Sequence, residues 1–234
     1  IIVTQEAYHG NSFLTAGFSP SLGEHSPLGT FVRQVPAPDS YRIPKEQIAD
    51  YFADQVALQI KDLERHGDGL AAFVVDSLFS SDGIYAEPAD MMKKVIDVVH
   101  EAGGVFVADE VQCGFGRGGD SMWGYQRFGL DPDIVTMGKP MGNGYPVAGI
   151  AVKHSIVESF AYDSRYFNTF GGNTVAMAAA QAVLNVIQDE KLVENSGTVG
   201  AFLKAGLQDL AKNHDVIGDV RGSGLYYGVE LVTD

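Results

Sequence analysis

Two reactive side chains stand where apolar segments of this sequence end. Lys139 follows the apolar run of residues 134–138, and Asp109 follows the run of residues 104–108. A lysine amine can form an imine with an aldehyde, whereas a carboxylate can pair with a protonated ring nitrogen. Most lysines are solvated surface charges, so Lys139 by itself indicates no chemistry. A chemical role for the two residues can be inferred only from the secondary-structure elements that position them.

Both apolar runs have the properties of buried strands. They are apolar throughout and are separated by segments with helical spacing, which favours parallel strands covered on both faces over alternating antiparallel ones. Ligands of open α/β sheets bind outside the carboxyl ends of the strands. An acid and a lysine at neighbouring strand ends suit pyridoxal phosphate, because its aldehyde forms an imine with lysine and its ring nitrogen pairs with a carboxylate.

The rest of the chain predicts an α/β protein. A helix is expected over residues 41–66, with Pro44 in its first turn and apolar residues at helical spacing. Residues 9–39 are rich in Gly, Pro and Ser and predict an extended loop region. The other expected strands cover residues 70–75, 104–109, 134–139, 147–152 and two parts of 216–232, and the other expected helices cover residues 88–100, 175–188 and 192–213. The last two helices are expected to complete the layer that covers the sheet.

The composition excludes several classes of function. The chain has 234 residues, 45% of them hydrophobic, with 16 basic and 30 acidic residues and a net charge of −14. Such acidity disfavours nucleic acid and anionic membrane surfaces as partners. No apolar segment reaches the roughly 20 residues needed to span a bilayer, so no membrane association is expected. The six histidines are scattered without a ligand pair at helical or short-loop spacing, so no metal site is expected.

Cys113 is the only cysteine, so no disulfide can form within the chain. A reducing compartment is the simpler assumption, and we expect a cytoplasmic protein. Although Cys113 lies close to Asp109 in the sequence, no identifiable base accompanies it. We therefore interpret Cys113 as a packing thiol.

Several motifs together resemble one enzyme family. Residues 107–117 read Val-Ala-Asp-Glu-Val-Gln-Cys-Gly-Phe-Gly-Arg, and residues 132–139 read Pro-Asp-Ile-Val-Thr-Met-Gly-Lys. With Tyr-His-Gly at residues 8–10, Phe-Gly-Gly-Asn at 170–173 and Arg-Gly-Ser-Gly-Leu at 221–225, they resemble the class III (subgroup II) aminotransferases of fold type I.

The resemblance implies a fold and a domain division. It implies an α/β large domain with a mostly parallel sheet between helical layers and pyridoxal phosphate as cofactor. Residues 1–215 would form the cofactor-binding large domain, and residues 216–234 would begin the C-terminal small domain. Because members of the family are longer, we expect the chain to be truncated at both ends.

The resemblance also implies a role for each matching residue. Lys139 would form the imine with the cofactor and shuttle a proton between substrate and cofactor, for which burial or a nearby positive charge must lower its pKa. Asp109 would pair with the pyridine nitrogen, and Gln112 would hydrogen-bond the phenolic oxygen. Val111 and Tyr8 would contact opposite faces of the ring. Taken singly, Asp109 could also be a loop-capping carboxylate, and Val111 or Gln112 ordinary loop packing.

Thr169 precedes the Phe-Gly-Gly-Asn motif. In the resembling family this hydroxyl reaches the cofactor phosphate of the neighbouring subunit, so the resemblance implies a homodimer with shared active sites. The other phosphate ligands of that family lie upstream of Tyr8, at the start of a helix. The chain is therefore expected to carry only part of the cofactor site.

One segment departs from the usual family pattern. Many class III members read Glu-Pro-Ile-Gln-Gly-Glu-Gly-Gly where this chain reads Asp-Ser-Leu-Phe-Ser-Ser-Asp-Gly at residues 76–83. The second glutamate of that pattern gates an arginine in enzymes that use glutamate as amino donor, and Ser81 replaces it here. The altered segment resembles the branch that contains the phospholyases of ethanolamine phosphate and phosphohydroxylysine.

Three functional interpretations follow from the resemblance. The first is an aminotransferase that moves an amino group between a primary amine or amino acid and a keto acid through the Lys139 imine. The alternative on the same cofactor is a phospholyase that eliminates phosphate from an amine phosphate. The third is a large-domain fragment without catalytic competence.

Overall fold

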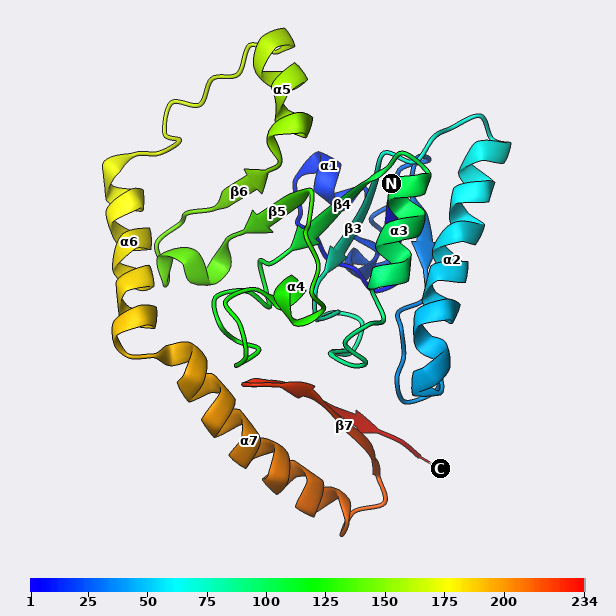
Figure 1. The fold of residues 1–234 in the computed structure, drawn as a ribbon, viewed down its shortest axis with the longest axis vertical. Helices are drawn as coiled ribbons and strands as arrows, with labels where there is room; N and C mark the ends of the chain where they lie inside the picture. The colour runs from blue at the N-terminus through cyan, green and yellow to red at the C-terminus, as the bar shows by residue number, and fades with distance from the viewer. Residues whose placement is uncertain (234) are drawn as a thin grey trace.

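The computed structural model describes residues 1–233, and a six-stranded sheet forms its centre (Figure 1). The strands follow the spatial order β2-β1-β3-β4-β5-β6. The first five in this order are parallel to their neighbours, and β6 pairs with β5 in the antiparallel sense. The bounds are Ile2–Thr4 (β1), Arg33–Val35 (β2), Ala72–Asp76 (β3), Val105–Asp109 (β4), Ile134–Met137 (β5) and Gly149–Val152 (β6). The prediction of an α/β fold with a mostly parallel sheet is confirmed.

Alternate side chains of the central strands enter two apolar clusters on opposite faces of the sheet. Phe73 and Val75 of β3 belong to the larger cluster together with Phe106 of β4. Val74 and Val107, from the same two strands, belong to the smaller cluster. Strands that bury both faces read as continuous apolar runs, which is why the sequence pattern predicted them.

Two helices cover the larger cluster. They are α2 (Lys45–Arg65) and α3 (Lys93–Glu101), which contact each other and lie on one side of the sheet (Figure 1). The buried stripe of α2 has the spacing of an amphipathic helix and includes Ile48, Phe52, Val56 and Ile60. Side chains from residues 7–32 cover the smaller cluster on the other face.

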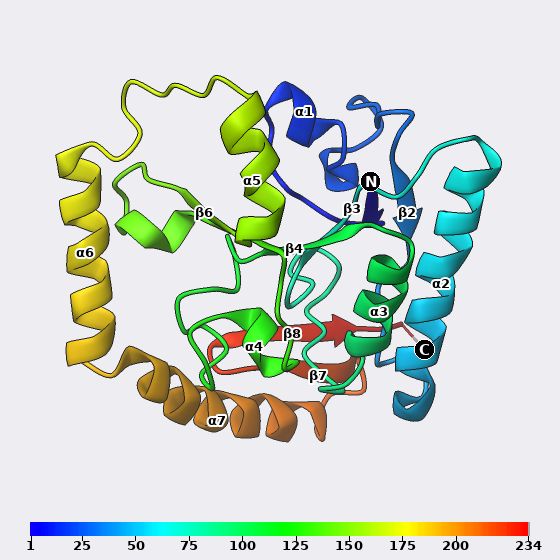
Figure 2. The same cartoon turned by 45° about the horizontal axis from the view of Figure 1, so that its top comes forward.

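Two further helices lie apart from the sheet that we expected them to cover. The main contacts of α6 (Thr174–Asp189) are with the 3₁₀ turn η2 (Lys139–Gly142), and those of α7 (Leu192–Ala211) are with the C-terminal hairpin. Both helices run along the outer edge of the molecule in Figures 1 and 2. Their positions in the sequence were predicted correctly, but the prediction that they complete the covering layer was wrong. The sequence predicted that these segments are helical without indicating what the helices contact.

The C-terminal hairpin forms a second sheet of its own. Strands β7 (Ile217–Ser223) and β8 (Tyr226–Leu231) pair in the antiparallel sense; the glycine-rich pattern predicted the two strands but not their pairing. Its turn packs against α7 through backbone contact, because a Cβ added to Gly200 would lie 1.8 Å from the carbonyl oxygen of Gly224. Only glycine permits this approach.

The region before α2 contains more structure than the expected extended loop. Besides β1 and β2, it includes helix α1 (Phe13–Ala16) and the 3₁₀ turn η1 (Pro20–Leu22). Strands of three residues are too short to show a period of two, so the sequence pattern missed them. Helices α4 (Gly124–Arg127) and α5 (His154–Asp163) were also missed.

Helix α3 begins later than predicted. The amide of Met91 donates to the carbonyl of Pro88 and that of Lys93 to Asp90, each at 3.2 Å. These bonds span three residues, as in turns, instead of the four residues of an α-helix. The helix therefore begins at Lys93 and not near Pro88, and Met92 is buried in the preceding turn.

Membrane-spanning and metal-binding features are both absent from the described residues. None of the helices within residues 1–233 combines the length and the apolar character that crossing a bilayer requires. Over the same range, no three side chains of His, Cys, Asp or Glu come together in a way that could hold a metal ion.

Candidate active site

Three polar residues stand side by side at the carboxyl ends of β3, β4 and β5. The parallel register pairs Asp76 with Asp109, and Asp109 with Thr136. Lys139 opens the η2 turn immediately beyond β5. The sheet thus brings the acid and the lysine to one edge, where ligands of such sheets bind.

Asp109 is a buried carboxylate with three hydrogen-bond donors. Its Oδ1 accepts bonds from the Val111 amide (3.1 Å) and the Thr136 hydroxyl (3.1 Å). Its Oδ2 accepts a bond from His9 Nδ1 (2.7 Å). The residue is 7% exposed. Since a carboxylate offers about four acceptor positions, these donors fix its orientation and leave one position on Oδ2 for a further donor.

Two of these donors were not predicted from the sequence. His9 belongs to the Tyr-His-Gly motif, but no role was assigned to it, and it lies 100 residues from Asp109 along the chain. Its Nδ1 carries the hydrogen, because a carboxylate only accepts, and its Nε2 is buried without a hydrogen-bond partner among residues 1–233. Thr136 stands within an apolar run, and only the strand register places its hydroxyl beside Asp109. The motif could have indicated His9, whereas nothing local indicates Thr136.

Lys139 projects from the η2 turn with its side chain exposed. Its Nζ lies over the ring of Tyr8, 5.9 Å from the ring centroid. Its φ of 21° lies in the left-handed range, which non-glycine residues seldom adopt and which is enriched at functional sites. The burial that we expected around this amine is not found within residues 1–233. A bound cofactor would have to exclude water from it.

The loop after β4 lies against the lysine turn. A Cβ placed on Gly138 would be 3.7 Å from Cγ2 of Val111, so the Val111 side chain is adjacent to the backbone that precedes Lys139. Gln112 follows in the same loop and is half-buried. Val111 thus joins Asp109 and Lys139 in one cluster, and Gln112 lies at its border.

Thr169 lies elsewhere in the chain. It belongs to the exposed residues 164–172 between α5 and α6, which run along the outer edge of the molecule in both views (Figures 1 and 2). The flanking Phe167 and Phe170 are 82% and 78% exposed. Within this chain, Thr169 is therefore separated from the cluster around Asp109.

Asp76 begins the altered segment of residues 76–83 and is fixed by the segment itself. Its Oδ2 accepts a bond from the Ser80 hydroxyl (2.5 Å), and its Oδ1 accepts one from the Leu78 amide (2.9 Å). The residue as a whole is half-buried, but these contacts enclose its carboxyl group. Burial raises the pKa of the Asp76 carboxyl to about 6.

Asp82 fixes the other end of the segment to β1. Its carboxyl accepts bonds from the Thr4 hydroxyl (2.7 Å) and from the Glu6 amide (3.1 Å). Burial raises the pKa of Asp82 to about 6 as well. Ser81, which the sequence resemblance aligns with the usual second glutamate, is exposed. The acids of the segment are therefore engaged within the chain, and neither occupies that position.

The titration of Asp82 makes a specific contribution to stability. Because folding raises this pKa, the folded protein binds the proton more tightly than the unfolded one. The resulting stability is present below about pH 4 and is lost as the pH rises to about 6, an effect of up to about 3 kcal/mol. We expect the free energy of unfolding of the wild type, relative to Asp82→Asn, to fall by up to this amount between these pH values, as measured by urea unfolding. The exposed Asp209→Asn should show no such trend, and a flat or rising difference for Asp82→Asn would contradict the assignment.

Glu110 and Cys113 serve the structure around the site. The Glu110 carboxylate is fully buried and accepts the amides of Gly124 (2.7 Å) and Tyr125 (2.9 Å) at the start of α4. The Cys113 thiol lies 3.3 Å from the same carboxylate. Burial, with nearby negative charge, raises the Cys113 pKa well above its ordinary value. A thiol that stays protonated is a poor nucleophile, which agrees with its interpretation as a packing residue.

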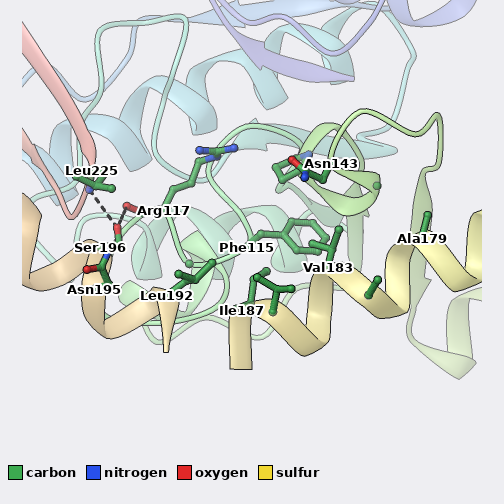
Figure 3. A pocket seen from close by; sticks show the side chains of 15 residues that line it. Phe115, Arg117, Asn143, Ala179, Val183, Ile187, Leu192, Asn195, Ser196 and Leu225 are labelled. Atoms are coloured by element: carbon green, nitrogen blue, oxygen red, sulfur yellow. Dashed lines mark hydrogen bonds between the residues drawn. The ribbon is translucent and has the colours of Figure 1, made fainter. Parts of the chain in front are cut away.

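A cavity of about 610 Å³ lies beside the lysine turn, between α6, the start of α7 and residues 115–117 (Figure 3). Apolar side chains such as Val183, Ile187 and Leu192 line it, together with Asn195. Pro140 and Gly142 of η2 border it, but Tyr8, Asp109 and Lys139 do not. The cavity is therefore distinct from the carboxylate-lysine cluster.

The residues of the cluster fit pyridoxal phosphate. The amine of Lys139 makes no hydrogen bond or ion pair within residues 1–233, so it is available to an aldehyde. Asp109 offers an oriented carboxylate with one acceptor position left for a protonated ring nitrogen. Tyr8 and Val111 supply the aromatic and aliphatic surfaces that a planar ring requires.

Comparisons with known proteins agree with this chemistry. The family model described as Aminotransferase class-III matches residues 1–234. The chain is 40% identical to "Ethanolamine-phosphate phospho-lyase homolog 1" of Caenorhabditis elegans, over all of this chain and 54% of that protein. It is 39% identical to "Alanine--glyoxylate aminotransferase 2 homolog 2, mitochondrial" of Arabidopsis thaliana, over all of this chain and 48% of that protein.

A solved structure shows the same similarity in three dimensions. A phospholyase from Arthrobacter in complex with phosphoethanolamine superposes with a TM-score of 0.93 at 36% identity. The alignment covers 99% of this chain and 56% of the phospholyase chain. The chain thus spans about half the length of the relatives it matches.

Proposed function

The chain belongs to the class III aminotransferases, whose cofactor is pyridoxal phosphate, and we propose that its protein eliminates phosphate from a small amine phosphate. The observation that carries this proposal is the segment of residues 76–83, which has Ser81 where glutamate-using transferases of the family have a glutamate. The similarity to phospholyases in sequence and in structure supports it. With this support we propose the phospholyase ahead of the aminotransferase, which is the first interpretation of the sequence.

Each residue of the cluster would have a separate role toward the cofactor. Pyridoxal phosphate supplies an aldehyde for Lys139 and a ring that takes up the electron pair released at the substrate carbon. Asp109 would hold the proton on the ring nitrogen, and Gln112 would donate a hydrogen bond to the phenolic oxygen. Val111 and Tyr8 would hold the ring between them.

Lys139 would also move the proton that the reaction requires. Its amine, released when the substrate amine takes its place, would remove a proton from the carbon that carries the nitrogen. Phosphate would then leave from the adjacent carbon with the electron pair of its carbon–oxygen bond, and the protonated Lys139 amine would return the proton to that carbon. Water completes the reaction by releasing ammonia and a carbonyl product, so no amino acceptor is consumed.

An aminotransferase is the second candidate. The Arabidopsis relative, whose name specifies alanine–glyoxylate aminotransfer, is 39% identical to this chain, almost the same as the C. elegans relative. The two reactions share the cofactor, the lysine and the carboxylate. They differ in whether the electron pair expels phosphate or is passed, with the amino group, to a keto acid.

The proposal extends to assembly, organisation and location. Thr169 and its exposed aromatic neighbours would face a second copy, whose cofactor phosphate Thr169 would bind, in a homodimer with shared active sites. Residues 1–215 would form the cofactor-binding domain, and residues 216–234, with their separate hairpin sheet, would begin the second domain. Cys113 is a buried free thiol, in keeping with a cytoplasmic location.

Phosphate release separates these functions. We expect the full-length protein with pyridoxal phosphate to release inorganic phosphate from ethanolamine phosphate in the absence of any keto acid. Amino transfer to glyoxylate or pyruvate without phosphate release would select the aminotransferase instead. Failure to develop the absorbance of bound cofactor would indicate a protein without catalytic competence.

A further inference from the structure

A chain of hydrogen bonds connects the C-terminal hairpin to the carboxyl edge of the sheet. The Tyr226 hydroxyl of β8 lies 2.5 Å from the Ser80 hydroxyl, which lies 2.5 Å from Oδ2 of Asp76. Because a carboxylate only accepts, Ser80 donates to Asp76, and its oxygen is then free to accept from Tyr226. Both hydroxyl groups therefore donate in the direction of the Asp76 carboxylate, and its negative charge strengthens both hydrogen bonds.

The hairpin is held against this segment by a second, independent contact. The Arg221 Nε of β7 donates to the carbonyl of Gly83 (2.7 Å), and its guanidinium lies over the Tyr85 ring, 4.7 Å from the centroid. Nη2 of the same residue pairs with Glu230 of β8 (2.6 Å). The position of Tyr226 relative to Ser80 is thus determined by more than one bond.

Asp76 stands where its charge reaches the proposed cofactor site. It is the direct neighbour of Asp109 in the parallel register of β3 and β4. The other titratable groups that face it are Glu110 and Cys113, which follow β4, and Tyr226 of the hairpin. The negative charges of Asp109 and Glu110 oppose ionisation of Asp76, so its ionised form depends on its donors.

Building on the proposed function, we propose that Tyr226 is a positioning residue that acts on the cofactor-binding edge through Ser80 and Asp76. We call the hydrogen bonds from Tyr226 to Ser80 and from Ser80 to Asp76 the relay. The relay keeps Asp76 ionised and oriented at neutral pH. A negative charge there favours a protonated ring nitrogen next to Asp109, which makes the ring a better acceptor of electrons. A segment at the start of the second domain thereby adjusts the electrostatics of the first.

The titration of Asp76 tests the relay without any catalytic readout. Burial raises the pKa of Asp76 to about 6, and the Ser80 bond opposes that rise. Removing the Tyr226 hydroxyl weakens Ser80 as a donor, so the pKa should rise further. In the cofactor-free full-length protein, the thermal unfolding midpoint should fall as the pH rises through the pKa of Asp76, in addition to the fall that Asp82 contributes, which Tyr226→Phe leaves in place. We expect Tyr226→Phe to displace this fall upward by about half a pH unit, and Ser80→Ala to displace it equally or more.

Matched backgrounds separate the relay from a purely structural role. In an Asp76→Asn background, Tyr226→Phe should change the midpoint by an amount independent of pH. Tyr227→Phe is the control, because the Tyr227 hydroxyl makes no hydrogen bond within residues 1–233. This substitution should leave the pH at which the unfolding midpoint falls unchanged. An unchanged titration in both Tyr226→Phe and Ser80→Ala, or a displacement that persists in the Asn background, would overturn the proposal.

The holoenzyme supplies the link to function. If the wild type releases phosphate, kcat/KM can be measured as a function of pH. The acid limb of this profile should shift to higher pH in Tyr226→Phe, by about half a pH unit. Lost packing would instead lower activity equally at every pH. If the acid limb stays at the same pH in Tyr226→Phe, the proposal that Tyr226 acts on the cofactor-binding edge is wrong. If the wild type releases no phosphate, the proposed function fails, while the unfolding experiment still decides the relay.

Discussion

Replacing Lys139 with alanine is expected to abolish covalent attachment of pyridoxal phosphate and to lower turnover on the order of 10⁴-fold. The amine is exposed, makes no polar bond within the described residues and lies over the Tyr8 ring at the carboxyl edge of the sheet. The same nitrogen would both bind the cofactor and move the substrate proton. Its loss therefore removes two functions at once, and no neighbouring group replaces either.

The absorbance of the bound cofactor and the rate of phosphate release measure this effect. Lys212→Ala is the matched control, because this lysine is exposed near the end of α7 and its only ion pair within residues 1–233 is with Asp209. It should retain the absorbance and the rate of the wild type. Unfolding midpoints of the two variants should agree closely, since neither side chain is buried. A cofactor spectrum that persists in Lys139→Ala would show that another residue carries the covalent link.

Replacing Asp109 with asparagine is expected to lower activity by about 10²- to 10³-fold. The substitution preserves size but removes the charge that would keep the ring nitrogen protonated. It also places an amide NH₂ among three donors, from His9, Val111 and Thr136, so at least one of them loses its acceptor. Because an unsatisfied buried donor costs about 1–3 kcal/mol, stability should fall as well.

The loss of activity can be distinguished from the loss of stability. Asp131→Asn is the matched control, since the Asp131 side chain is 88% exposed and its ion pair with Lys153 lies at the surface. Activity of Asp109→Asn should be measured well below its unfolding temperature, where the folded population is complete. Retention of more than about a tenth of wild-type activity under those conditions would contradict the assigned role of Asp109.

The parts that could be predicted from the sequence were those encoded by local pattern. Continuous apolar runs with abrupt polar ends predicted β4 and β5, and the rule for parallel sheets then placed Asp109 and Lys139 at one edge. The helical spacing of α2 predicted its buried stripe. The two C-terminal strands were predicted around Gly222 and Gly224, but the close approach of Gly224 to Gly200 of α7 was found only in the structure.

The parts that could not be predicted depend on contacts between distant residues. The bond from His9 to Asp109 joins residues 100 positions apart, and the Thr136 hydroxyl reaches Asp109 only through the register of two strands. Ser80 and Tyr226 are 146 positions apart. A prediction of helical structure likewise does not show what the helix packs against, which is why the packing of α6 and α7 was mispredicted.

Reduction of the holoenzyme with borohydride, followed by peptide mass spectrometry, tests the central claim most directly. Borohydride makes the bond between the cofactor and its lysine permanent, so the modified peptide identifies the residue. The account predicts a single phosphopyridoxyl group on the peptide that contains Lys139, with none on peptides that contain Lys153 or Lys212. Modification of a different lysine, or none after saturation with pyridoxal phosphate, would contradict it.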